Sequence, residues 1–225
     1  MIRVENLRFQ YPDSPPILQG IHYTQAAGEA VALLGPNGSG KTTFALHLNG
    51  ILQGEGLVEV CGIRVEPGTL EKVRQRVGFV FQAAENQLFL PTVLEDTMFG
   101  LLNQGMPREE AEQRARAILT RLHLEAYFER NPFHLSAGEK RRAALAGVVV
   151  MEPDILILDE PTTFLDPPGI RDLARLLNEL PMAKLIITHD AAFAERTCPE
   201  AVFFQAGQIV ARGATADLLD EFDWR

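Results

Sequence analysis

The segment Gly35–Thr42, which reads Gly-Pro-Asn-Gly-Ser-Gly-Lys-Thr, limits the possible folds of this chain more than any other feature. Its spacing is that of a phosphate-binding loop, G-x-x-x-x-G-K-[ST]. The apolar run 30–34 precedes it, and a helical pattern extends from Thr42 to about Ile51. A strand, a glycine-rich turn and a helix in this order are the context in which the motif binds phosphate. The segment therefore predicts a site for a nucleoside triphosphate.

The residue types in this loop have physical reasons to be there. Glycines let main-chain N–H groups turn toward phosphate oxygens, and the start of the helix adds positive potential. Lys41 is expected to reach the β- and γ-phosphates, and the Thr42 hydroxyl to ligate Mg²⁺. A glycine-rich turn that binds nothing is the alternative, and the matching flanks argue against it. The expected nucleotide-binding residues are Asn37, Gly38, Ser39, Gly40, Lys41, Thr42 and Thr43.

Polar residues follow two other apolar runs. Asp159 and Glu160 follow the run 155–158, and because neighbours on a strand point to opposite faces, we expect them to have different tasks. Asp159 is expected to hold Mg²⁺, and Glu160 to act as general base on the attacking water. Two solvated acids are the alternative, which is weaker here because ligands collect at this edge of parallel sheets. His189 follows the run 185–188 and is a candidate partner of the γ-phosphate.

Two further segments allow more than one interpretation. The run Ser136–Glu139 predicts a capping box at a helix start, and it also fits a second anion site. Both can hold at once, and the anion site implies a phosphate presented by another protomer. Tyr11, just before Pro12, either stacks on adenine or simply ends an edge strand, and the local sequence supports both equally.

The patterns along the chain indicate a single domain over residues 1–225. The continuously apolar runs are typical of parallel strands covered on both faces. Residues 91–153 differ: they begin a helix at Pro107, continue with a second helix at 137–150, and predict a helical subdomain inserted into an α/β core. Residues 2–9 alternate as an edge strand does, with one slip of register. The strand candidates are 2–9, 30–34, 57–60, 77–81, 155–158, 185–188 and 202–211.

Composition excludes some classes of function. A formal net charge of −9 argues against a nucleic-acid-binding surface, which is normally basic. The longest apolar stretch, 143–151, is too short to span a bilayer, so any membrane role is expected to come through a partner.

Taken together, the motifs resemble those of the nucleotide-binding subunit of ATP-binding cassette (ABC) transporters. The resemblance implies a P-loop NTPase with a mixed sheet core, an N-terminal antiparallel β region and an inserted α-helical subdomain, binding ATP and Mg²⁺. It also implies that Gln82 is a catalytic residue and a Mg²⁺ ligand, and that Ser136, Gly138 and Glu139 contact ATP. The matching motifs, in chain order, are Tyr11 (A-loop), 35–43 (Walker A), Gln82 (Q-loop), 135–139 (signature), 155–160 (Walker B), Asp166 (D-loop) and His189 (switch histidine).

Within this family, residues 81–89, with 91–93 and 99–100, are similar to ATPases of cobalt, nickel and vitamin importers of the energy-coupling-factor type. There are departures from the usual family pattern. Glu139 places an acid near a proposed phosphate, which Arg141 and Arg142 could offset, although a solvated helix face is the alternative for both arginines. In the D-loop, Phe164 is bulkier than the residue that is common there.

The resemblance implies a motor that hydrolyses ATP for a membrane transporter, at the cytoplasmic face of the cell membrane and peripheral to it. Two subunits, identical or paralogous, are expected to clasp ATP head to tail, with Glu160, His189 and Gln82 as the catalytic residues. Leu88 and Phe89 are expected to contact integral membrane subunits, burial in the helical lobe being the alternative. The competing functions are a soluble ABC ATPase that acts on nucleic acid or ribosomes, and a nucleotide-binding regulatory module without turnover.

Overall fold

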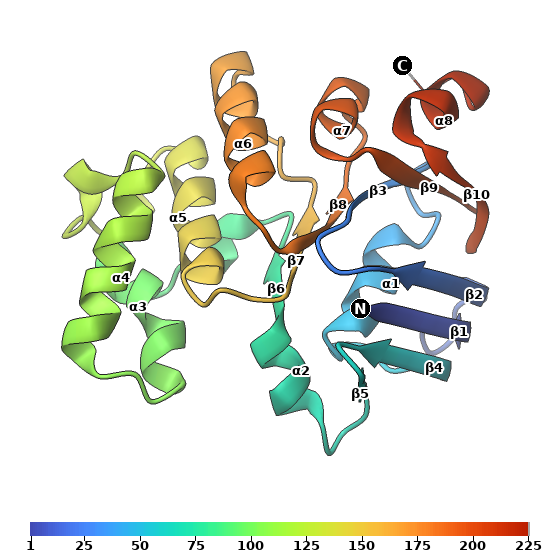
Figure 1. Cartoon of the computed structure of the whole chain (residues 1–225), viewed down its shortest axis with the longest axis horizontal. Coiled ribbons are helices and arrows are strands. Elements are labelled where there is room, and N and C mark those ends of the chain that lie inside the picture. The colour runs from blue at the N-terminus through green and yellow to red at the C-terminus, as the bar shows by residue number, and fades with distance from the viewer. Residues whose placement is uncertain (225) are drawn as a thin grey trace.

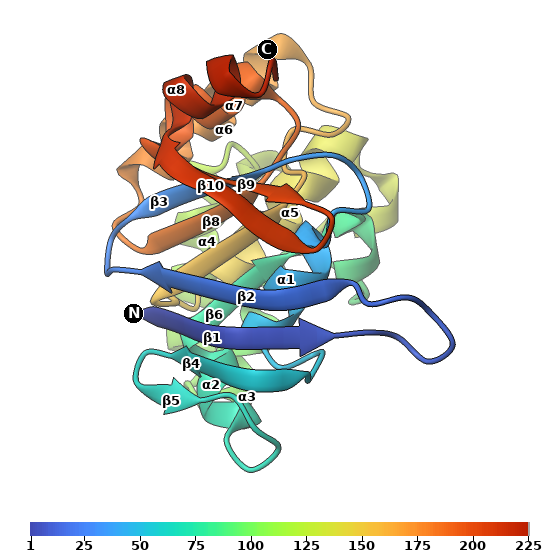
Figure 2. The ribbon, with the colours of Figure 1, turned by 90° about the vertical axis from the view of Figure 1, so that its right-hand side faces the viewer.

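The computed structural model describes residues 1–224, apart from the side chain of Glu85. Two sheets and the helices around them make up this part of the chain (Figure 1). The smaller sheet is antiparallel, has the strand order β2-β1-β4-β5, and lies beside the larger sheet in Figure 2. Its strands are β1 (Ile2–Phe9), β2 (Leu18–Gln25), β4 (Glu55–Val60) and β5 (Ile63–Arg64).

The larger sheet is mixed, with the strand order β10-β9-β3-β8-β7-β6. All its pairs are parallel except β10 with β9. The predicted fold class, a mixed sheet core with an N-terminal antiparallel region and inserted helices, is confirmed. The strands are β3 (Ala30–Leu34), β6 (Val77–Val80), β7 (Ile155–Asp159), β8 (Ala183–Ile187), β9 (Glu200–Gln205) and β10 (Gln208–Ala214).

Helices α3, α4 and α5 pack on one another at the left of Figure 1, within the range predicted for the helical subdomain. The α-helices are α1 (Lys41–Leu48), α2 (Leu70–Arg76), α3 (Val93–Asn103), α4 (Arg108–Arg121), α5 (Ala137–Val149), α6 (Pro167–Glu179), α7 (Ala191–Thr197) and α8 (Thr215–Glu221). Short 3₁₀ helices are η1 (Ala84–Gln87), η2 (Glu125–Tyr127) and η3 (Pro132–His134). Across residues 1–224, each helix is too short or too polar to cross a bilayer.

The larger sheet explains where the core lies. Successive residues of β7 point to opposite faces, so Ile155 and Ile157 join one apolar cluster while Leu156 and Leu158 join the other. Helices α3 to α8 cover one face, and the antiparallel sheet together with α1 and α2 covers the other. Burial on both faces is why the strand is apolar throughout, and it leaves only the strand ends free to carry polar side chains.

Several predicted boundaries were wrong. Strand β1 is not an edge strand, because β2 and β4 pair with it on either side, although the predicted slip of register is present after Val4. The single candidate 202–211 is a hairpin, β9 and β10, that turns at Ala206 and Gly207 with positive φ. Helix α1 ends at Leu48 rather than near Ile51, and β6 ends at Val80. Strand β2 and helices α2 and α3 were not predicted.

Candidate nucleotide-binding site

The phosphate loop joins β3 to α1. Lys41 is buried, and its ammonium group donates to the carbonyl oxygens of Gly35 (2.7 Å) and Pro36 (2.9 Å). Burial lowers the pKa of Lys41, and the nearby Glu160 and Asp159 charges oppose that shift. Since a lowered lysine pKa reflects a poorly solvated cation, an anion entering the loop would be stabilised by this ammonium group.

The Thr42 hydroxyl lies at the end of β7, where it donates to Asp159 Oδ2 over 3.0 Å. Burial raises the pKa of Asp159, the Glu160 charge adds to the effect, and the Thr42 hydrogen bond opposes it. Hydroxyl and carboxylate are hard oxygen donors of the kind that Mg²⁺ takes beside substrate phosphates. Among the side chains that the structure describes, no group of three or more His, Cys, Asp or Glu residues is arranged to hold a metal ion.

Glu160 follows the last residue of β7, and its side chain has a different partner from that of Asp159. Its carboxylate Oε2 lies 2.8 Å from His189 Nδ1 and accepts a weaker hydrogen bond of 3.4 Å from the His189 main-chain N–H. The Glu160 backbone has a φ of 48°, in the left-handed region, and its N–H donates to Ile187 O over 2.9 Å. In this backbone conformation, the largely buried Glu160 carboxylate points toward His189, which follows the neighbouring strand β8.

One cleft of about 280 Å³ collects most of the predicted site residues. Two apolar residues that were not predicted, Ile17 and Ile187, also line it. Ile17 lies in a proline-rich loop without a motif, so nothing in the sequence signalled its place. Ser39 lies outside the lining, because its side chain is buried beneath the loop. The predicted residues in the lining are Asn37, Gly38, Gly40, Lys41, Thr42, Thr43, Gln82, Asp159, Glu160 and His189.

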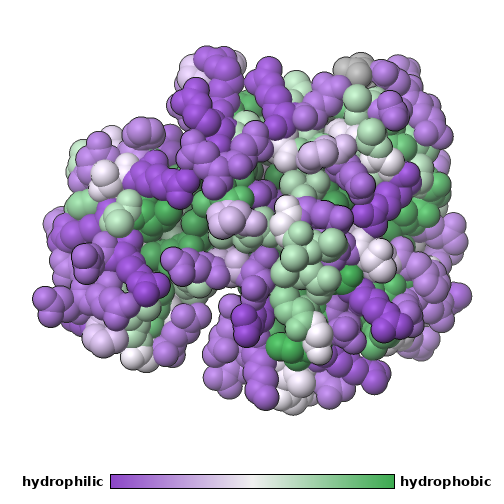
Figure 3. Space-filling view, in the orientation of Figure 1, coloured by the Kyte–Doolittle hydropathy of each residue, from purple (hydrophilic) through white to green (hydrophobic). Residues whose placement is uncertain are grey.

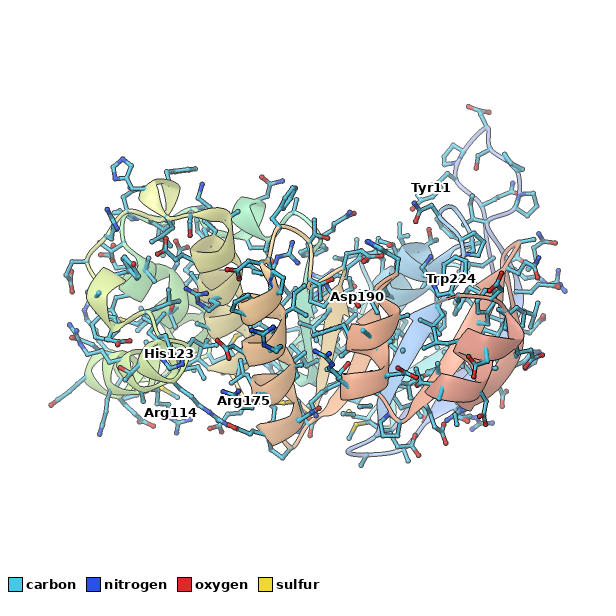
Figure 4. All side chains as sticks on the ribbon, turned by 90° about the horizontal axis from the view of Figure 1, so that it is seen from above. Tyr11, Arg114, His123, Arg175, Asp190 and Trp224 are labelled. Carbon is cyan, nitrogen blue, oxygen red and sulfur yellow. The ribbon has the colours of Figure 1, made fainter. Side chains whose placement is uncertain are left out.

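Tyr11 does not line the cleft. It lies beyond β1 on a loop at the margin of the molecule (Figure 4), and its ring meets Phe9 edge-on at 4.9 Å. Its exposed fraction of 39% leaves a ring face free. Adenine stacking and the plain end of a strand therefore both remain compatible with its position.

The signature segment also lies outside this cleft. Ser136 and Glu139 form the predicted capping box: Ser136 N–H donates to Glu139 Oε2 (2.7 Å), and Glu139 N–H donates to Ser136 Oγ (3.4 Å). A hydrogen bond from the Tyr127 hydroxyl lowers the pKa of Glu139, partial burial opposes it, and the Ser136 and Arg142 contacts lower it further. Neither Ser136, Gly138 nor Glu139 lines the cleft within one chain.

One prediction about exposure was wrong. Leu88 is buried, with an exposed fraction of 6%, so only Phe89 of that pair reaches the surface, where its ring meets Phe99 edge-on at 5.0 Å. For Arg141, the alternative of a solvated helix face does not hold, because the residue is 5% exposed. The surface in Figure 3 is otherwise mainly hydrophilic, with apolar patches that include parts of the helical subdomain.

Comparison with known proteins places these features in context. Residues 18–163 match the ABC transporter family. The energy-coupling factor transporter ATP-binding protein EcfA of Methanothermobacter thermautotrophicus is 42% identical over 97% of this chain and 72% of its own length. The structure of cbiO1 from Clostridium perfringens, part of the ABC transporter complex cbiONQ, matches with a TM-score of 0.88 at 35% identity over 99% of this chain and 91% of that one. A dimeric bacterial ABC transporter cassette, MJ0796, matches with a TM-score of 0.88 at 28% identity over 96% and 99%.

Proposed function

This chain belongs to the ABC transporter family, as an ATP-binding subunit similar to those of energy-coupling-factor transporters, and on that premise we propose that it hydrolyses Mg·ATP to drive transport through membrane partners. One observation carries the proposal: a single cleft holds the phosphate loop, the Thr42–Asp159 pair and the Glu160–His189 pair. These are the parts that phosphoryl transfer to water needs, namely phosphate positioning, cation ligands and a general base.

In the proposed mechanism, Lys41 exchanges its two loop carbonyls for β- and γ-phosphate oxygens. Glu160 accepts the proton of the attacking water, and His189 orients the Glu160 carboxylate and reaches the γ-phosphate. Thr42, Asp159 and Gln82 would hold Mg²⁺, which supplies positive charge to the phosphate oxygens when bound. The low exposure of the Glu160 carboxylate supports this role, since a site that excludes bulk water limits side reactions at the reacting phosphate.

A second subunit completes the site in this proposal. Ser136 and Gly138 are outside the cleft of their own chain, so the Ser136 hydroxyl and the Gly138 N–H would meet the γ-phosphate held by a head-to-tail partner, identical or paralogous. Each site is then incomplete until two subunits close, which gates hydrolysis. The dimeric MJ0796 cassette supports a paired arrangement, and Glu139 would lie close to the same phosphate.

The names of the relatives support a subunit of an energy-coupling-factor transporter. We further propose that the transporter imports cobalt or nickel ions or a vitamin, and that this subunit lies on the cytoplasmic face of the membrane. The exposed pair Phe89 and Phe99 would contact an integral membrane subunit, because a T-shaped aromatic pair exposes apolar area that a partner can cover. Residues 91–153 would form the subdomain that transmits closure to that partner.

A phosphate-release assay on the parent and on Glu160→Gln tests the proposal. Replacing the base should slow turnover by about 10²–10⁴-fold while ATP still binds. Glu71→Gln is the matched control, because Glu71 is an exposed carboxylate on α2, far from the cleft lining. A parent protein that binds ATP without releasing phosphate, or a Glu160→Gln variant with the parent rate, would refute the assignment.

A further inference from the structure

Arg141 lies in the second turn of α5, five residues after Ser136, with only 5% of its surface exposed. An arginine does not lose its charge in a protein, so a buried guanidinium must be matched by acceptors. From the sequence, we expect Arg141 either to offset the Glu139 charge or to lie on a solvated helix face, and neither implies burial. Neighbouring segments must therefore supply acceptors for the buried guanidinium.

Two main-chain carbonyls accept from the Arg141 guanidinium. Its Nη1 donates to Glu160 O over 2.6 Å, and its Nη2 donates to Gln82 O over 2.7 Å. These carbonyls belong to the segments that follow β7 and β6, which are adjacent parallel strands paired through Val80 and Leu158. One planar group thus joins α5 to two of the three segments that carry candidate catalytic residues.

The contact holds a strained residue. Glu160 is in the left-handed region with a φ of 48°, a conformation that a non-glycine residue keeps only where its surroundings impose it. Its N–H is bound to Ile187 O in the sheet, and its C=O is bound to Arg141. The sheet therefore holds one end of the residue, and the helical subdomain holds the other.

We infer that Arg141 is a positioning residue that links the helix bearing Ser136 to the main chain of Glu160 and Gln82. A shift of α5 against the sheet moves the guanidinium, and both carbonyls follow it. The placement of the Glu160 carboxylate then depends on where α5 lies. The inference rests on the proposed function, because that function makes Glu160 the base. An arginine is needed since its rigid fork reaches two acceptors at once, which a lysine ammonium on a flexible stem does not.

The first experiment is Arg141→Lys, which keeps the charge and removes the fork. We expect kcat to fall by about 10²-fold, because a small misplacement of a catalytic group has an effect of that size. ATP affinity and melting temperature should stay unchanged. Lys140→Met is the control, because Lys140 is the adjacent cation on the same helix and lines no part of the cleft. If Arg141 were purely structural, Arg141→Lys would lower the melting temperature, and kcat would not fall while ATP affinity stayed unchanged.

A second experiment uses Arg141→Ala with added ethylguanidinium, and ethylammonium as the control salt. Ethylguanidinium should restore part of kcat, and ethylammonium should not. Hydrogen exchange of this variant should rise at the amides next to residues 82 and 160 and stay at parent levels in β3. This readout needs no activity, so it also decides the matter if Arg141→Lys fails to fold.

The outcomes separate the two hypotheses. If the parent protein releases no phosphate, the proposed function is wrong. If the parent is active and Arg141→Lys turns over at the same rate, the inference is overturned while the function stands. Unchanged hydrogen exchange around residues 82 and 160 in Arg141→Ala also overturns the inference.

Discussion

The helices α1 and α5 both begin at a candidate phosphate-binding motif, but their first turns are built differently. Helix α1 starts after Gly40, has no side-chain cap and carries no acid in its first turn. Helix α5 starts after Ser136 with a complete capping box and an acid, Glu139, in that turn. The first N–H groups of any helix lack acceptors within the helix. In α5 side chains of the same chain supply acceptors, whereas in α1 no side chain does.

The difference suggests an order of events. The start of α1 keeps its N–H groups and dipole available, and a phosphate can serve as the missing cap. At α5, Ser136 and Glu139 already use these positions, and the Glu139 charge opposes an anion. We therefore expect phosphate to bind first at α1, and to meet α5 only when a second subunit brings it there.

The largest effect that tests this comparison should come from Ser136→Arg. The bulky side chain blocks the approach of the second subunit, so turnover should fall by at least about 10²-fold, while ATP binding by the monomer stays intact. Ser136→Ala is the matched variant, which removes the cap and should cost only about 1 kcal/mol of stability. Phosphate release, ATP titration and denaturant unfolding measure these effects. Parent-level turnover in Ser136→Arg would mean that α5 has no part in the reaction.

An intermediate effect is expected at the loop before α1. Gly35 has a φ of 127°, and a Cβ there would overlap the main-chain oxygen of Phe204, whereas Gly38, with a φ of 78°, has open space around it. Gly38→Ala should cost about 1–2 kcal/mol of unfolding free energy from backbone strain alone. Gly35→Ala should cost about 1–3 kcal/mol more, because strand β9 must move as well. Equal costs in denaturant unfolding would show that the loop is not held against β9.

The smallest effect concerns the acid at α5. The folded-state pKa of Glu139 is lowered, chiefly by Tyr127, so its stabilising contribution is complete above the ordinary glutamate pKa of about 4.3 and is lost as pH falls below it. Glu139→Gln keeps the capping geometry without a charge and should lose less stability across that range. The difference should be below about 1 kcal/mol, since the group is partly solvated. Unfolding is measured for both proteins above and below that pH. An equal loss of unfolding free energy in the parent and in Glu139→Gln would contradict the prediction.

The sequence located the polar residues of the cleft well because each follows a buried strand. Asp159 and His189 come after apolar runs, and parallel neighbours bring such ends to one edge of a sheet. Strand β1 was misjudged because alternation within a strand does not reveal how many neighbours it has. Leu88 was placed outside because a short apolar pair looks the same in a sequence whether the segment that follows a 3₁₀ helix is buried or lies on a surface.

By itself, the sequence determined the phosphate loop and the capping box, because both depend on contacts among residues a few positions apart. Only the tertiary structure decided what Arg141 does. Its acceptors lie 19 and 59 residues away along the chain, and no local spacing encodes them. The same physics placed Ser136 outside the cleft of its own chain: helix α5 packs with the helical subdomain, and that packing sets the distance between the two helix starts.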